Sequence, residues 1–237
     1  AAGEVVAEAG ALTVDIPAYA YPAEAKNTVR LGRALTGADF DVEAPEDAAE
    51  VRARVIGVVE NQAPTKALEA TLPVRDGRVA LDPCSGVHRI ALVERHKGTG
   101  GVTNGFVTGF GYDVPCAVAS SVAHDSHHMI VVGTSTNDMA KAANHLGEIG
   151  GGVTVWREGR ALATVPLPIA GLMSDKRAEE VAEEAEAMVA AMADCGCRLN
   201  NAFMQHSLLA LVVIPELRIS DLGLVDVTRF ETTELFL

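Results

Sequence analysis

The stretch "AVASSVAHDSHHMIVVGT", residues 117–134, decides the fold, because it sets two apolar runs on either side of one short polar segment. A single strand of this length would be unusual, since strands average about 5–6 residues. The pair Asp125-Ser126 favours a turn. We therefore predict two strands, at 117–123 and 129–134, joined as a hairpin with histidines flanking its tip.

The polar segment at the tip concentrates groups that bind metals or transfer protons. Residues 123–128, "AHDSHH", hold three of the seven histidines of the chain and one carboxylate. A turn could bring His124, Asp125 and His127 round a common point, and zinc, iron and manganese accept imidazole and carboxylate ligands. The alternative is a polar turn whose histidines only hydrogen-bond to the backbone, and the spacing leaves both interpretations open.

A second polar cluster follows the apolar strand pattern at 88–95. The segment "ERHKGTGG", residues 94–101, places Glu94 and His96 on one face of the strand end. Either residue is a candidate proton-transfer group or ligand, whereas a surface turn with a salt bridge is the structural alternative. No G-x-x-x-x-G-K-[ST] motif is present, so the segment is not a phosphate-binding loop.

The remaining pattern predicts more strands than helices. One amphipathic helix is expected from an N-cap at Thr136 to the glycines at 150–152, and another after a cap at Ser174. The tail from residue 207 is expected to give a continuous apolar strand, a break at Pro215 and a final short strand. Together these patterns predict an α+β fold, with a mixed or antiparallel sheet and a few packed helices. Further strands or hairpins are expected at 51–59, 70–81, 88–95, 101–111 and 153–169.

The first 48 residues differ from the rest. A small β-hairpin turning at Gly10 is followed by a proline-containing connector with little periodicity. We expect residues 1–48 to follow a larger preceding domain, and residues 49–237 to form the α+β domain.

Composition narrows the class of protein. With 49% hydrophobic and 22% charged residues, the chain is expected to be globular, and its net charge of −13 disfavours nucleic-acid binding. It carries neither a membrane-spanning apolar run nor a signal-peptide pattern, so we expect a cytoplasmic protein. The four cysteines are too sparse for a disulfide scaffold, and Cys195-Gly-Cys197 is expected to be a reduced pair.

Six segments of the chain carry a further signal: "VERHKGTG", "GFVTGFG", "ASSVAHDSHHMIVVGT", "NDMAKAANHLGEIGGGVTV", "VPLPIAGLMSD" and "VIPELRISDLGLVDVTRFE". Together they resemble the C-terminal region of bacterial adenine deaminase, a member of the amidohydrolase superfamily. The resemblance covers nearly the whole chain from about residue 50, and the first 48 residues look like the part that follows the family's barrel.

The resemblance implies a purine-salvage hydrolase that converts adenine to hypoxanthine and ammonia. Its main machinery is expected on a (β/α)₈ barrel holding a pair of divalent metals, manganese or iron and possibly zinc, with an H-x-H motif. No H-x-H occurs in this chain, so the barrel is expected elsewhere, as a partner domain. This domain would close, shape or complete the site, and we expect a homo-oligomer.

The family's motif reads H-D-S-H-N, and this chain matches its first four positions at 124–127 and departs at His128. A metal site at His124, Asp125 and His127, or a wall of the adenine pocket, are both open. The alternative function is a non-catalytic assembly or ligand-binding module in which these histidines are structural.

Overall fold

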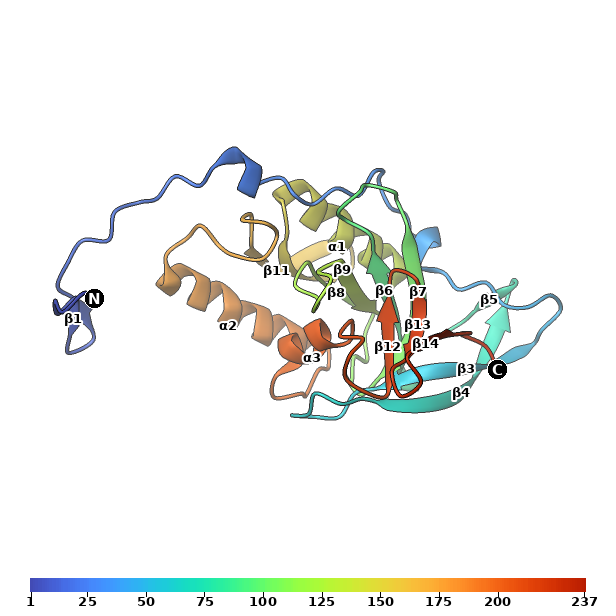
Figure 1. The fold of residues 1–237 in the computed structure, drawn as a ribbon. Coiled ribbons are helices and arrows are strands. Elements are labelled where there is room, and N and C mark those ends of the chain that lie inside the picture. The colour runs from blue at the N-terminus through green and yellow to red at the C-terminus, as the bar shows by residue number, and fades with distance from the viewer.

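A nine-stranded mixed sheet forms the centre of the computed structural model, which describes residues 1–237 (Figure 1). Its strands run in the order β11-β10-β8-β9-β6-β7-β3-β4-β5, and every neighbouring pair is antiparallel except β3 and β7. The strands are β3 (Glu50–Gly57), β4 (Lys66–Arg75), β5 (Arg78–Val79), β6 (Val87–Val93), β7 (Val102–Thr108), β8 (Cys116–Ser120), β9 (Met129–Gly133), β10 (Gly152–Arg157) and β11 (Arg160–Pro166).

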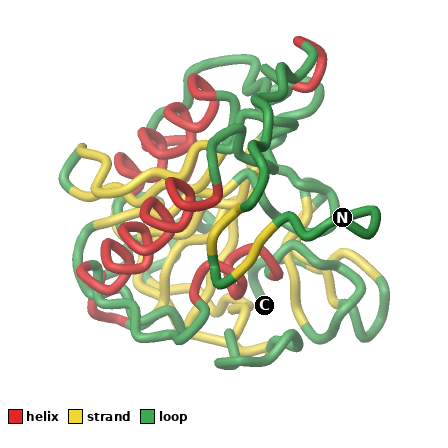
Figure 2. Tube along the Cα trace, turned by 90° about the vertical axis from the view of Figure 1, so that its left-hand side faces the viewer, coloured by secondary structure: helices red, strands yellow, loops and turns green.

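Helices cover both faces of this sheet, which confirms the α+β fold class. Helix α1 (Thr136–Ile149) packs in one buried cluster with Ala91, Val93 and Val131. Helix α2 (Ala178–Asp194) packs in another with Ile90 and Leu92. Successive residues of a strand point to opposite faces, so a sheet covered twice needs apolar residues at every position. That requirement explains the uninterrupted apolar runs of the sequence. Figure 2 shows the helices, in red, packed beside the yellow strands.

Hairpins are present within 70–81 and 153–169, as expected, and the expected helix caps need correction. The hairpins turn at Asp76-Gly77 and at Glu158-Gly159, all with positive φ, as a type I′ turn requires. The N-cap of α1 is Ser135 rather than Thr136, because the Ser135 hydroxyl accepts the Asp138 N–H. Ser174 accepts the N–H of Lys176 in a preceding turn, and α2 begins only at Ala178.

The tail prediction is wrong for residues 207–214. The segment contains the end of helix α3 (Ala202–Leu208) and then turns, with no strand before β12 (Leu217–Ser220). The buried Arg218 guanidinium donates to the carbonyls of Leu208, Ile214, Pro215 and Ala63. Carbonyls held by a guanidinium are withdrawn from a strand ladder, so the apolar run folds around the arginine instead.

Strand β12 joins β13 (Gly223–Asp226) and β14 (Glu231–Thr233) in a small antiparallel sheet that contacts β7. At the other end of the chain, the hairpin β1 (Ala7–Glu8) and β2 (Ala11–Leu12) lies apart from the body on an extended tether (Figure 1).

The connector after this hairpin contains two short 3-10 helices, η1 (Ala23–Ala25) and η2 (Gly37–Phe40). A third, η3 (Pro83–Ser85), lies between β5 and β6. From Val29 onward the connector's apolar side chains pack on the body, and Phe40 is fully buried against the cluster that contains α1. None of the helices is both long enough and apolar enough to cross a membrane.

Candidate functional site

The hairpin predicted at residues 117–134 is confirmed, and it positions the first polar cluster. Strands β8 and β9 pair antiparallel from Ser120 opposite Ile130, and residues 124–126 form the turn beyond them. The turn is held from both sides, because the His124 N–H donates to the Ser207 carbonyl at 2.9 Å and the His127 N–H donates to the Ala123 carbonyl at 2.7 Å. His127 takes a positive φ of 51°, which turns the chain back into β9.

The turn brings the two outer candidate ligands into contact. The rings of His124 and His127 lie edge to face with centroids 5.2 Å apart, and Asp125 is exposed at the tip. Nδ1 of His127 accepts the Ala123 N–H at 3.2 Å, so in the neutral ring Nε2 carries the proton and is a donor. Burial lowers the pKa of His127, and His124 and Arg95 lower it further, so the ring is neutral and its single lone pair is already used by the Ala123 N–H.

These side chains do not form a metal site by themselves. No group of three or more His, Cys, Asp or Glu side chains is arranged to hold a metal ion. Two imidazoles and one carboxylate match in number the three protein ligands of a catalytic zinc site, but they do not converge on one point. We therefore derive no reaction step through a metal bound by this chain alone.

The second polar cluster is organised by Glu94, which is 8% exposed. Its carboxylate accepts the N–H groups of His96, Lys97 and Thr99 at 2.6, 2.7 and 3.0 Å, and the Thr99 hydroxyl at 3.1 Å. Burial alone raises the pKa of Glu94, but the hydrogen bonds outweigh it and lower this pKa to about 2. Glu94 is thus a fixed anion that shapes the loop at 94–101.

His96, the other candidate of this cluster, reaches across to the turn. Its Nε2 donates to the Ser126 carbonyl at 2.8 Å, so in the neutral ring Nδ1 carries the lone pair and can accept a proton. The ring lies 4.7 Å from that of His128, measured between centroids. The two polar clusters that the sequence presents separately therefore form one site.

The register of β6 against β9 explains why the two polar clusters meet. Strands β6 and β9 are neighbours in the sheet, with Val93 opposite Met129. Glu94 follows the first residue and His128 precedes the second, so the two side chains come together at the same end of the strand pair. His128 is 8% exposed, and its Nδ1 lies 4.0 Å from Oε1 of Glu94.

Arg95 fastens the two clusters together. Its guanidinium is 2% exposed, and it donates from Nε to the His127 carbonyl and from Nη1 to the Ala170 carbonyl at 3.2 Å. Burial lowers the pKa of Arg95, and no carboxylate forms a salt bridge with it. Gly171 allows this approach, because a Cβ there would lie 2.8 Å from Nη1 of Arg95.

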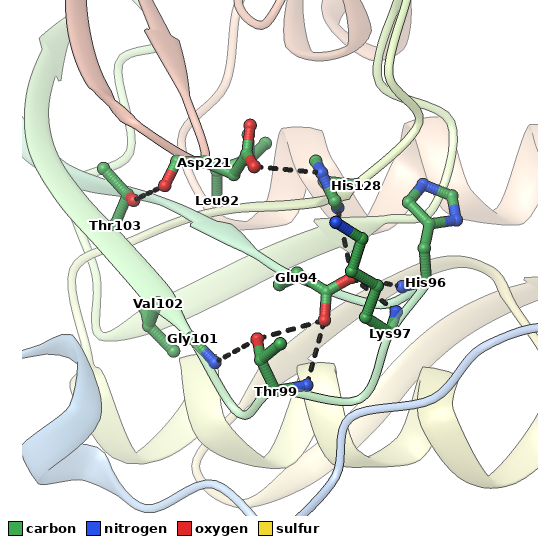
Figure 3. A pocket seen from close by; sticks show the side chains of 10 residues that line it. All are labelled: Leu92, Glu94, His96, Lys97, Thr99, Gly101, Val102, Thr103, His128 and Asp221. Carbon is green, nitrogen blue, oxygen red and sulfur yellow. Dashed lines mark hydrogen bonds and ion pairs between the residues drawn. The ribbon is translucent and has the colours of Figure 1, made fainter.

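A polar pocket of about 380 Å³ opens beside these residues (Figure 3). Asp221, from the turn between β12 and β13, closes it, and its Oδ2 lies 3.6 Å from Nε2 of His128. Thr103 holds that turn in place by donating its hydroxyl to the Asp221 carbonyl at 3.0 Å. The pocket is lined by Leu92, Glu94, His96, Lys97, Thr99, Gly101, Val102, Thr103, His128 and Asp221.

The roles of Arg95, His128 and Asp221 are not apparent from the sequence. The register of β6 against β9 could have placed His128 beside Glu94 once those strands were paired. Nothing local marks Asp221, since it reaches the pocket from a turn more than ninety residues along the chain from His128.

Comparisons with a family model and with individual proteins point to the same family. Residues 62–231 match the model of the adenine deaminase C-terminal domain. A protein named adenine deaminase from Paracoccus denitrificans is 69% identical over 235 residues, which are 99% of this chain and 39% of that protein. "Adenine deaminase 3" of Rhizobium meliloti is 66% identical and an adenine deaminase of Moorella thermoacetica 46% identical, each over 98% of this chain and 39% of the relative. The chain thus spans about two fifths of these curated relatives, and it belongs to the family of adenine deaminase C-terminal domains.

Proposed function

We propose that this chain acts as the C-terminal part of an adenine deaminase, which hydrolyses adenine to hypoxanthine and ammonia. The observation that carries the proposal is the joining of two polar clusters by Arg95 into one histidine-rich surface. A purely structural turn would not require three histidines, two of them in contact with the loop at 94–101. The relatives' shared name supplies the reaction.

Hydrolytic deamination needs a nucleophilic hydroxide at C6 of adenine and a proton for the departing amine. A divalent metal, manganese or iron, would supply the hydroxide and would be held mainly by residues outside this chain. His96 is the proposed proton-transfer group, since its Nδ1 lone pair is free and its other nitrogen is fixed to Ser126. Glu94 acts as a positioning residue, because its carboxylate is already occupied by loop donors.

His124, Asp125 and His127 are proposed to face the metal-bearing part and to complete its site. Their support is the contact between the rings of His124 and His127 and the exposed position of Asp125 at the tip of the same turn. Elemental analysis of the longest natural protein that contains this chain, beside its His124→Ala and His127→Ala variants, tests this directly. Metal retained by the wild type and lost in both variants supports a site, whereas metal retained in both variants contradicts it.

Residues 1–48 are proposed to connect this domain to the barrel. Their support is a run of exposed apolar side chains in the first 21 residues, unlike the buried apolar residues of the body. They are Val5, Leu12, Val14, Ile16, Tyr19 and Tyr21. We further propose a cytoplasmic homo-oligomer working in purine salvage.

Adenine turnover tests the catalytic proposal, measured in the longest natural protein that contains this chain. His96→Gln is expected to lower kcat at least tenfold, in line with the usual contribution of a proton-transfer group. His127→Gln is also expected to lower kcat, because it removes a side chain proposed to complete the metal site. His145→Gln is the matched control. His145 lies in α1 and packs against Trp156 of β10, outside the site. Unchanged turnover in both site variants would support the assembly module instead.

A further inference from the structure

The connector that follows the N-terminal hairpin forms the outer wall of the loop at 94–101. Val29 of the connector is buried in the same apolar cluster as Val93 and Met129, the register pair at the end of β6 and β9. One residue further on, the Arg30 N–H donates to the Arg95 carbonyl at 2.8 Å. The connector is therefore fixed to the body at the point where the loop begins.

The closest approach between the connector and the loop is backbone against backbone. At Gly32, whose φ is +78°, an added Cβ would lie 2.6 Å from the carbonyl carbon of Gly98 and 3.2 Å from the amide nitrogen of Gly100. Contacts this short leave room for glycine alone, and the positive φ favours glycine as well. Figure 3 shows the connector as a blue ribbon that passes beside the loop carrying His96 and Lys97. The loop thus cannot move outward without displacing the connector.

Arg33 fastens the far end of the loop. Its Nη2 donates to the Gly100 carbonyl at 3.1 Å, and its two terminal nitrogens pair with both carboxylate oxygens of Asp39, at 3.0 and 2.6 Å. Asp39 is fixed in turn, because it accepts the Thr36 N–H at 2.7 Å. The Arg33 side chain is 47% exposed, and an ion pair so exposed adds little to stability. Its main effect is therefore expected on the position of the loop.

His96 lies in the middle of this loop, which is held from two sides. On the inner side, the Glu94 carboxylate accepts three N–H groups of the loop. On the outer side, the connector fixes both ends of the loop, and the His96 ring donates to the Ser126 carbonyl at 2.8 Å. Displacing a reacting group by about 1 Å can lower a rate on the order of 100-fold. The path of the connector therefore bears on the chemistry proposed for His96.

We propose that Gly32 and Arg33 are positioning residues for His96, so that the connector sets the place of the proposed proton-transfer group. The inference rests on the proposed function for the role of His96, whereas the contacts between connector and loop do not depend on it. Neither Gly32 nor Arg33 lines the pocket beside His96, so both act through the loop. Because residues 1–48 are proposed to connect this domain to the barrel, the barrel is tied to His96 through the chain itself.

The first test follows the His96 ring by NMR in the longest natural protein that contains this chain, with histidine carrying ¹³C at Cε1. The His96 signal is identified as the one lost in His96→Gln. Gly32→Ala and Arg33→Met are each expected to shift this signal, because each releases the loop from the connector. Arg33→Met leaves the connector backbone free of steric strain, so it keeps the test open to refutation if Gly32→Ala does not fold.

Each variant has a matched control away from the site. Gly77→Ala matches Gly32→Ala, because Gly77 has a φ of +72° and nothing within 4 Å of an added Cβ. Arg52→Met matches Arg33→Met, because Arg52 is 65% exposed and pairs with a carboxylate of the neighbouring strand β4. Neither control is expected to shift the His96 signal. Equal shifts in variants and controls, or an unchanged signal in both variants, overturn the proposal.

Adenine turnover in the same proteins separates this inference from the proposed function. Gly32→Ala and Arg33→Met are expected to lower kcat about tenfold and to leave KM unchanged, since the pocket keeps its lining. Wild-type kcat in both variants, where His96→Gln is impaired, overturns the proposal. Full turnover in His96→Gln contradicts the proposed function instead, and the His96 signal then decides the positioning by itself.

Discussion

Two buried arginines hold two regions of this molecule in different ways. Arg218 in the tail is fully buried and donates to four backbone carbonyls. Arg95 at the site is 2% exposed and donates to two carbonyls, both belonging to loops that border the histidine cluster. Arg218 supplies hydrogen-bond donors to backbone carbonyls that would otherwise be unpaired, so we expect it to govern stability. Arg95 joins separate loops, so we expect it to govern the geometry of the site.

Removing Arg218 should give the largest loss of stability. Arg218→Met leaves buried carbonyls without donors, and we expect a loss of about 4 kcal/mol in the free energy of unfolding. Burial lowers the pKa of Arg218 to about 10, so the side chain is still a cation at neutral pH and its bonds are charge-assisted. Urea denaturation measures the change, and a loss below about 1 kcal/mol would contradict this view of the tail.

The tail also shows where the sequence stops being informative. Alternating and continuous apolar runs predicted the sheet, both long helices and the hairpin of residues 117–134, because those signals are local. The apolar run at 207–214 resembles a strand as well as the other runs do, but Arg218 binds two of its carbonyls, those of Leu208 and Ile214. Nothing near a single arginine in the sequence indicates that it will bind these carbonyls. Likewise the sequence presented Glu94, His96 and the turn histidines, and only the pairing of β6 with β9 brings them together.

Replacing Glu94 is expected to have an intermediate effect on the free energy of unfolding, and this effect depends on pH. The folded pKa of about 2 lies below the ordinary value of 4.5, so the carboxylate stabilises the fold above pH 4.5, and that contribution is lost as pH falls towards 2. The difference corresponds to about 3 kcal/mol. Glu94→Gln should remove this part of the acid dependence, as measured by unfolding between pH 2 and 6. Asp125→Asn, an exposed carboxylate in the neighbouring turn, is the control, and an identical acid profile for Glu94→Gln and wild type would refute the assignment.

The smallest effect on stability is expected at Gly171, and it separates the two arginines most sharply. Gly171 has a φ of +71°, and an added Cβ would lie 2.8 Å from Nη1 of Arg95. Gly171→Ala should cost about 1 kcal/mol for the left-handed backbone and displace the guanidinium from the Ala170 carbonyl. Gly223→Ala is the matched control, since Gly223 also has a positive φ of 131° but has nothing within 4 Å of its added Cβ. Because Arg95 also holds His127, only Gly171→Ala should shift the ring resonances of His127, and equal shifts in both variants would show that Arg95 does not set the geometry of the turn.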